Sequence, residues 1–78
     1  MAHWSTYREY GLSIDRAVIA EYDLSVMRID DAAYWLVARD GRDVAEGEAA
    51  TPERARRCAE VEAEIAARVR RSPLLGLF

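Results

Sequence analysis

Few residues of this chain are of a type that performs covalent chemistry. Cys58 is the only cysteine and His3 the only histidine. A nucleophilic cysteine needs a neighbouring base or a helix N-terminus, but Cys58 falls about two turns into the helix predicted below. We therefore interpret Cys58 as a packing residue and His3 as a solvent-exposed one. Since a structural zinc site takes four Cys or His ligands, the sequence predicts no metal site, no cofactor and no enzyme.

Glu62 falls within the apolar stripe of the same helix. A buried carboxylate with a raised pKa is the kind of group that an enzyme uses. No second catalytic group lies near Glu62 in the sequence, so we favour a simpler interpretation. In that interpretation Glu62 lies at the edge of the stripe, where it pairs with an arginine or faces a dimer partner.

Acidic side chains are the main candidate binding feature. Residues 21–48 hold eight acidic residues against three arginines, a net charge of −5. Such a field can steer a charged partner. It is either an ordinary solvated surface or an anionic patch for a basic groove that normally holds nucleic acid. The candidate partner-binding residues share the solvent side of the sheet or its rim, and they are Glu21, Asp23, Asp30, Asp31, Glu46 and Glu48.

Arginines offer an alternative, because they can contact phosphates directly. All eleven basic residues are arginine, and six of them follow residue 51. Glutamates share that segment, however, and the whole chain has a net charge of −3. Nucleic-acid binders are usually strongly basic overall, so a small nucleic-acid-binding accessory protein is the less favoured alternative.

The chain is short enough to be one domain, residues 1–78. Residues 1–16 are expected to form an irregular arm that carries aromatic rings, and residues 17–49 a β-meander. Residues 13–22 fit a helical stripe and also strand alternation. The alternation continues further along the chain, which favours a first strand that ends near Ile29. The second strand is expected over 34–39, and Asp40–Gly41 is a strong hairpin signal before a third strand over 43–49.

A helix is expected over 51–71. Thr51 is a good N-cap, and Pro52 suits the first helical position. The apolar stripe should face the sheet, and it contains Ala55, Val61, Cys58, Ile65, Ala66 and Val69. The predicted fold class is therefore α+β, a three-stranded antiparallel β-meander with one long C-terminal α-helix packed on one face.

The segment 72–78 is an apolar tail without a periodic partner. It folds back over the core, or it docks on a second subunit or another protein. An oligomeric phage structural or assembly protein, such as a homodimer sealed by this tail, is thus a further alternative. Its contact residues would be Leu74, Leu75, Leu77 and Phe78.

The expected location is the cytoplasm of a bacterial host. No apolar run approaches the roughly 20 residues of a membrane span, and the N-terminus lacks the order of a signal peptide. One cysteine fits a reducing compartment. Arginine as the only basic residue, together with fourteen alanines, suggests a GC-rich genome.

Several short patterns together carry a resemblance. They are Tyr22-x-Leu24-x-Val26, then Trp35-x-Val37, then 40–49, then Thr51 with Ala55 and Ala59 at intervals of four. Over roughly residues 20–67 the chain resembles small proteins encoded by phages, prophages and mobile elements, which have a β-meander followed by a helix.

Among phage proteins of this size and acidity, the chain resembles anti-CRISPR proteins, which are short, single-domain, non-enzymatic and often acidic. That resemblance implies a stoichiometric inhibitor of a bacterial CRISPR–Cas surveillance complex, which blocks its DNA-binding or nuclease-recruitment surface. Members of this class share no motif, so no functional residue is carried over, and the assignment is an analogy.

Overall fold

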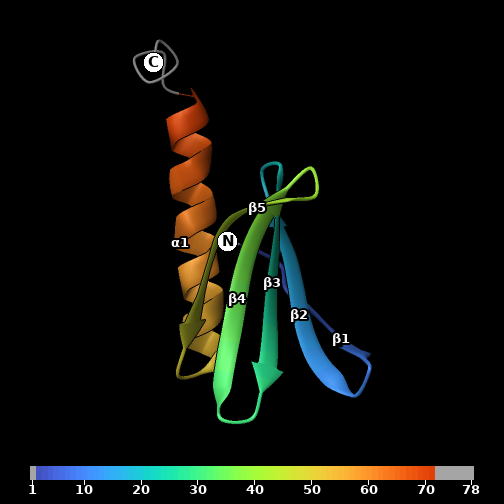
Figure 1. The fold of residues 1–78 in the computed structure, drawn as a ribbon. Coiled ribbons are helices and arrows are strands. Elements are labelled where there is room, and N and C mark those ends of the chain that lie inside the picture. Colours follow the sequence, from blue (N-terminus) through green and yellow to red (C-terminus); the bar gives the residue numbers. More distant parts are fainter. Residues whose placement is uncertain (1, 72–78) are drawn as a thin grey trace.

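The protein is an α+β domain of one antiparallel sheet and one helix, described here from a computed structural model for residues 2–71. The sheet has five strands in chain order, each paired with the next. The helix follows the last strand and covers one face of the sheet (Figure 1). The elements are β1 (Ser5–Glu9), β2 (Leu12–Ile19), β3 (Tyr22–Ile29), β4 (Ala32–Arg39), β5 (Arg42–Ala49) and α1 (Pro52–Arg71).

The expectation of three strands is wrong, because the N-terminal part of the chain also joins the sheet. The segment 1–16, expected as an irregular arm, contains β1 and the start of β2. The expected first strand is in fact two strands, because the chain reverses at Ala20–Glu21. Neither residue is typical of a turn. The alternation of apolar and polar residues therefore indicated one continuous strand through this point.

The hairpins repeat every ten residues. Four two-residue turns, at 10–11, 20–21, 30–31 and 40–41, separate strands that are eight residues long from β2 onward. The first residue of each turn has a positive φ of 53 to 55°. In the first and last turns a glycine follows, with φ of 76 and 77°. This left-handed backbone twists the turn in the sense that antiparallel strands require.

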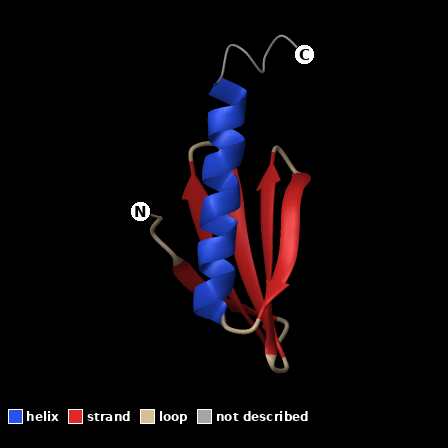
Figure 2. Cartoon of the chain, turned by 90° about the vertical axis from the view of Figure 1, so that its left-hand side faces the viewer, coloured by secondary structure: helices blue, strands red, loops and turns tan. Residues whose placement is uncertain are grey.

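The helix begins as expected. The Thr51 hydroxyl accepts a hydrogen bond from the Arg54 backbone N–H at 3.2 Å, and Pro52 takes the first helical position. Figure 2 shows α1 lying along the sheet, roughly in the direction of the strands. Among the described residues, no helix is long and apolar enough to cross a membrane.

The buried face of the helix agrees with the expected stripe at Ala55 but differs from it further along the helix. Ala55, Ala59 and Ala63 are completely buried against the sheet. Val61, Ile65 and Val69, expected in the core, are each nearly half exposed. The reason is steric, since bulky residues of the sheet such as Tyr22 and Trp35 fill the interface and leave room only for methyl side chains.

The sheet contributes the large residues of the core. Tyr22, Leu24 and Val26 alternate toward α1 from β3, and Val37 does so from β4. Ala45, Gly47 and Ala49 of β5 face the helix side, and all are partly buried. Val44 is an extra residue at an irregularity in the β4–β5 pairing, and it lines a hollow with Tyr22 and Arg70.

Candidate protein-binding face

One face of the sheet is covered by α1, and we call the other the open face. Strand pairing places side chains of the open face in rows that cross the sheet. One row runs Tyr7, Ile14, Met27, Tyr34 and Glu48, from β1 to β5. The next row runs Ser5, Arg16, Ser25, Leu36 and Glu46.

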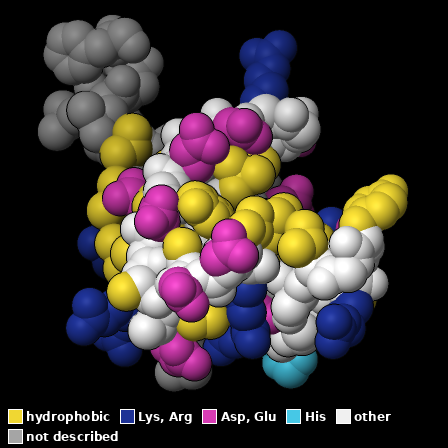
Figure 3. All heavy atoms as spheres, turned by 60° about the horizontal axis from the view of Figure 1, so that its bottom comes forward, with side chains coloured by type: hydrophobic (Ala, Val, Ile, Leu, Met, Phe, Trp, Pro, Cys, Tyr) yellow, Lys and Arg dark blue, Asp and Glu magenta, His cyan; other side chains and the backbone are white. Residues whose placement is uncertain are grey.

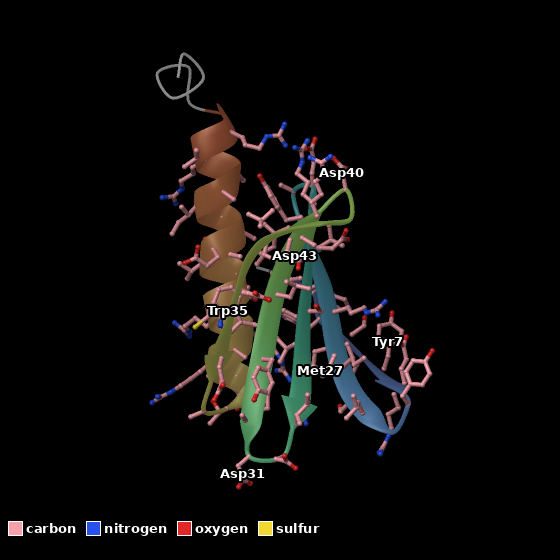
Figure 4. The ribbon with its side chains drawn as sticks, viewed as in Figure 1. Tyr7, Met27, Asp31, Trp35, Asp40 and Asp43 are labelled. Carbon is pink, nitrogen blue, oxygen red and sulfur yellow. The ribbon has the colours of Figure 1, made fainter. Side chains whose placement is uncertain are left out.

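The middle of the open face is apolar. Ile14 is buried by its neighbours, whereas Ile29 and Tyr34 are 38% and 42% exposed. Met27 and Leu36 lie between them on β3 and β4 and are partly exposed. We call these five residues the apolar strip. Four of them, Met27, Ile29, Tyr34 and Leu36, line a hollow of about 540 Å³ together with Glu46 and Glu48. Met27, a residue of the strip on β3, is labelled in Figure 4.

Carboxylates flank the apolar strip on its β5 side and at one end. Glu46 and Glu48 project from β5, and Asp23 and Asp43 belong to a third row with Ala38. All four acids are exposed, and none makes a salt bridge within the described part of the chain. Seen from the end that is lowest in Figure 1, hydrophobic side chains form a band with acidic ones around it (Figure 3).

Arg16, a basic residue of the open face, already forms a salt bridge with Glu9. Arg16 lies on the open face and its guanidinium is 3.7 Å from the Glu9 carboxylate, in an exposed pair. Two charges of opposite sign cancel there. The negative charge of Asp23, Asp43, Glu46 and Glu48 therefore dominates the face.

Of the predicted acidic residues, Glu21 does not join this face. It lies in the β2–β3 turn, where its carboxylate is 2.6 Å from the Arg39 guanidinium and 3.0 Å from that of Arg70. The prediction that Glu21 shares a side with Asp23 is wrong, because alternation stops at the turn. Its charge is compensated by β4 and α1.

Asp30 and Asp31 form the β3–β4 turn at the end of the sheet where Asp31 is labelled in Figure 4. Both are exposed, and they follow Ile29 of the apolar strip directly. They lie at the rim of the open face, where the sequence placed them. Asp43, at the start of the expected third strand, is part of β5 and adds a carboxylate to the face.

Asp15 is a buried charged residue that sequence reasoning missed. It is completely inaccessible and faces the helix side of β2. The Thr6 hydroxyl donates a hydrogen bond to it at 2.8 Å, and the Arg56 guanidinium of α1 lies 2.9 Å away. Arg28 of β3 approaches within 3.4 Å. Asp15 therefore joins β1, β2, β3 and α1 through one carboxylate.

Burial by itself raises the pKa of the Asp15 carboxyl. The hydrogen bonds from Thr6 and Arg56 and the positive charges of Arg56 and Arg28 outweigh burial, so the pKa falls below its usual 3.8. The group is therefore charged at neutral pH. Because the carboxylate is fully partnered, the cluster stabilises the fold and is not a free acid or base for catalysis.

Several arginines considered for phosphate contacts are engaged in the fold. Arg56 binds Asp15, while Arg70 binds Glu21. On the same helix, Glu60 accepts a hydrogen bond from the Trp4 indole at 2.8 Å. The ion pairs of Arg56 and Arg70 reduce the positive charge that the helix presents to a nucleic acid.

Of the residues first considered for chemistry, Cys58 and Glu62 lie one turn apart on α1 and line the same hollow. Cys58 is partly buried on α1, as is Glu62, whereas His3 is exposed before β1. Within residues 2–71 no group of three or more His, Cys, Asp or Glu side chains could hold a metal ion. Leu74, Leu75, Leu77 and Phe78, named above for an oligomer contact, lie outside the described residues.

Comparisons of the chain with models of protein families, with curated proteins and with solved structures find no significant match.

Proposed function

We propose that this chain is a non-enzymatic inhibitor that binds a basic surface of another protein through its open face. One observation carries the proposal. Four exposed carboxylates without salt-bridge partners among the described residues, Asp23, Asp43, Glu46 and Glu48, lie beside the apolar strip on the open face.

The two components of the face have different roles. Apolar side chains stabilise a complex when they leave water, and their exposed area here is continuous over β3 and β4. The carboxylates beside them favour a cationic partner, speed its association and disfavour acidic ones. An apolar centre with a charged rim is the usual anatomy of a protein interface.

A protein surface that binds DNA is a natural cationic partner, because it carries arginines and lysines for the phosphates. Carboxylates on a rigid sheet occupy such a surface in place of DNA. We propose as target the bacterial CRISPR–Cas surveillance complex that the resemblance to anti-CRISPR proteins implies, and as mechanism the blocking of its DNA-binding or nuclease-recruitment surface. The open face supports a basic partner, and the resemblance supplies the target class.

The test compares two triple variants that change the net charge equally. The first neutralises the face with Asp23→Asn, Glu46→Gln and Glu48→Gln. The matched control, Asp40→Asn, Glu53→Gln and Glu64→Gln, changes exposed acids elsewhere. The measurement is DNA cleavage by a reconstituted surveillance complex with increasing inhibitor.

We expect the face variant to need at least about tenfold more protein for half-inhibition, while the control matches the wild type. Equal potency of the two variants would contradict recognition through the open face. If the wild type neither inhibits cleavage nor recovers surveillance subunits from a bacterial lysate, the target is wrong. In that case the face can be tested against other basic proteins.

A further inference from the structure

The sheet has two edges, and they differ in their surroundings. Within residues 2–71, no strand lies beside the outer backbone groups of β1 or of β5. β1 is five residues long and is not in contact with α1. β5 is longer and lies beside α1 over its second half, where the strand runs toward the start of the helix (Figure 1).

The helix carries an apolar stripe that nothing in the described structure covers. Val61, Ile65 and Val69 are spaced by four residues, so they lie on one side of α1. They are 46%, 47% and 47% exposed. The opposite alanine face already provides the contact with the sheet, so this second stripe is not needed for folding onto it.

A hollow lies between Val61, at one end of the helix stripe, and Trp35 of β4. It has a volume of about 390 Å³ and is lined by Trp35, Cys58 and Val61, with Arg54, Arg57 and Glu62. Trp35 belongs to β4, but its indole passes close to Gly47 of β5, where a Cβ would be only 2.7 Å from the ring. The absence of a side chain at Gly47 therefore lets the indole reach the hollow.

We propose that the β5 edge and this hollow bind an extended segment of a partner protein as a sixth strand. Backbone groups of β5 would pair with the segment, which is the recognition mode called β-augmentation. The segment would alternate large apolar residues with basic ones. The β1 edge does not serve this purpose, because no helix lies beside it to receive the apolar side chains.

The alternation follows from the pleat of β5. Ala45, Gly47 and Ala49 face the helix side, whereas Glu46 and Glu48 face the open side. Neighbouring residues of paired strands point to the same face. Apolar side chains of the added strand would thus enter the hollow beside Val61. Basic side chains would lie opposite Glu46 and Glu48, and opposite charges across a strand pair are stabilising.

A second copy of the chain does not fit this edge. Pairing β5 with its own copy would bring Glu46 and Glu48 together with the same residues of the partner, and like charges across strands are destabilising. It would also offer only Ala45, Gly47 and Ala49 to the hollow, which are too small to fill it. The complementary segment is therefore a foreign one.

This inference does not rest on the proposed function, since it concerns the edge of the sheet and its test uses no surveillance complex. The probe is a capped heptapeptide that alternates lysine and isoleucine. Its binding is measured by NMR on isotope-labelled protein, with amide exchange as a second readout. We expect slower exchange for β5 amides that point away from β4.

Two controls separate strand addition from charge attraction. A peptide with proline at the central position keeps its charge but cannot pair along the edge, so it should lose the protection. Val61→Glu should weaken binding at least about tenfold. Val18→Glu, at a valine that is 61% exposed on the open face, adds the same charge and should leave affinity unchanged.

The inference is overturned if the heptapeptide does not bind, or if it binds without slowing exchange in β5. Protection at β1 instead of β5 would overturn it as well. Equal affinities of Val61→Glu and the wild type would show that the helix stripe takes no part.

Discussion

The indole of Trp35 occupies the space that a side chain at position 47 would need. A Cβ built on Gly47 would lie 2.7 Å from Cζ2 of Trp35 and 2.8 Å from both Cε2 and Nε1. Gly47 is therefore a steric requirement of the core, although its backbone is ordinary extended strand. Two residues on neighbouring strands, β4 and β5, share one volume.

Gly47→Ala should therefore destabilise the fold by about 1–3 kcal/mol, because the ring must move within a packed interface. Urea unfolding measures the change in free energy. Trp35→Phe removes the part of the ring that collides, so Gly47→Ala should cost less in that background. Gly41→Ala serves as control, because its strain comes from a φ of 77° with no atom within 4 Å. Its cost should not depend on position 35.

Asp15→Asn should destabilise the protein by about 3 kcal/mol, since it leaves Arg28 and Arg56 beside a group without charge. Asn keeps the size of the side chain, so the loss reports the charge and its hydrogen bonds. Asp23→Asn makes the same chemical change at an exposed site of the open face and should be nearly neutral. Similar unfolding free energies for the two variants would show that the buried cluster is not stabilising.

The same carboxylate predicts a dependence of stability on pH. Its pKa is lower in the folded state than the usual 3.8, so the unfolded state takes up the proton first as the pH falls. The contribution of Asp15 is thus fully present above about pH 4 and is lost at lower pH. Unfolding free energies of the wild type and Asp15→Asn should converge below that pH. A constant difference down to about pH 2 would contradict a lowered pKa.

The sequence predicted the C-terminal half of the fold because its signals are local. Asp40–Gly41 marks a turn by residue type, and Thr51–Pro52 marks a helix start. The reversal at Ala20–Glu21 lacks such a signal, so β2 and β3 were merged. Gly11 and Gly41 mark two turns that are thirty residues apart. Two further turns at regular ten-residue intervals between them would have predicted the reversal at Ala20–Glu21.

The orientation of the helix could not be predicted from periodicity alone. Both sides of α1 carry apolar residues, and the larger ones, such as Val61 and Ile65, were assigned to the core. Packing selected Ala59 and Ala63 instead, because the sheet supplies the bulk. A hydrophobic pattern shows which sides of a helix are apolar. The steric fit between the helix and the sheet decides which of these sides is buried.

The candidate site was predicted in part. Asp23, Glu46 and Glu48 do share one face, because their strands were placed with the correct alternation. Glu21 was assigned to the wrong face because the turn that follows β2 was not predicted. The apolar strip was missed because no strand partner had been assigned to Ile14. Asp15 carried no signal, since a buried acid becomes recognisable only when Thr6 and Arg56 are brought to it.

Ala20 offers a test of the unexpected hairpin. Its φ of 55° lies in the left-handed region, where a Cβ is strained but glycine is not. Ala20→Gly relieves that strain and makes the unfolded chain more flexible, which offsets part of the gain. We expect a net stabilisation of about 0.5–1 kcal/mol, seen as a rise of a few degrees in Tm by calorimetry. Ala32→Gly, in the first position of β4, should instead destabilise, because no positive φ is relieved there. A lower Tm for Ala20→Gly would mean that the chain does not turn at this residue.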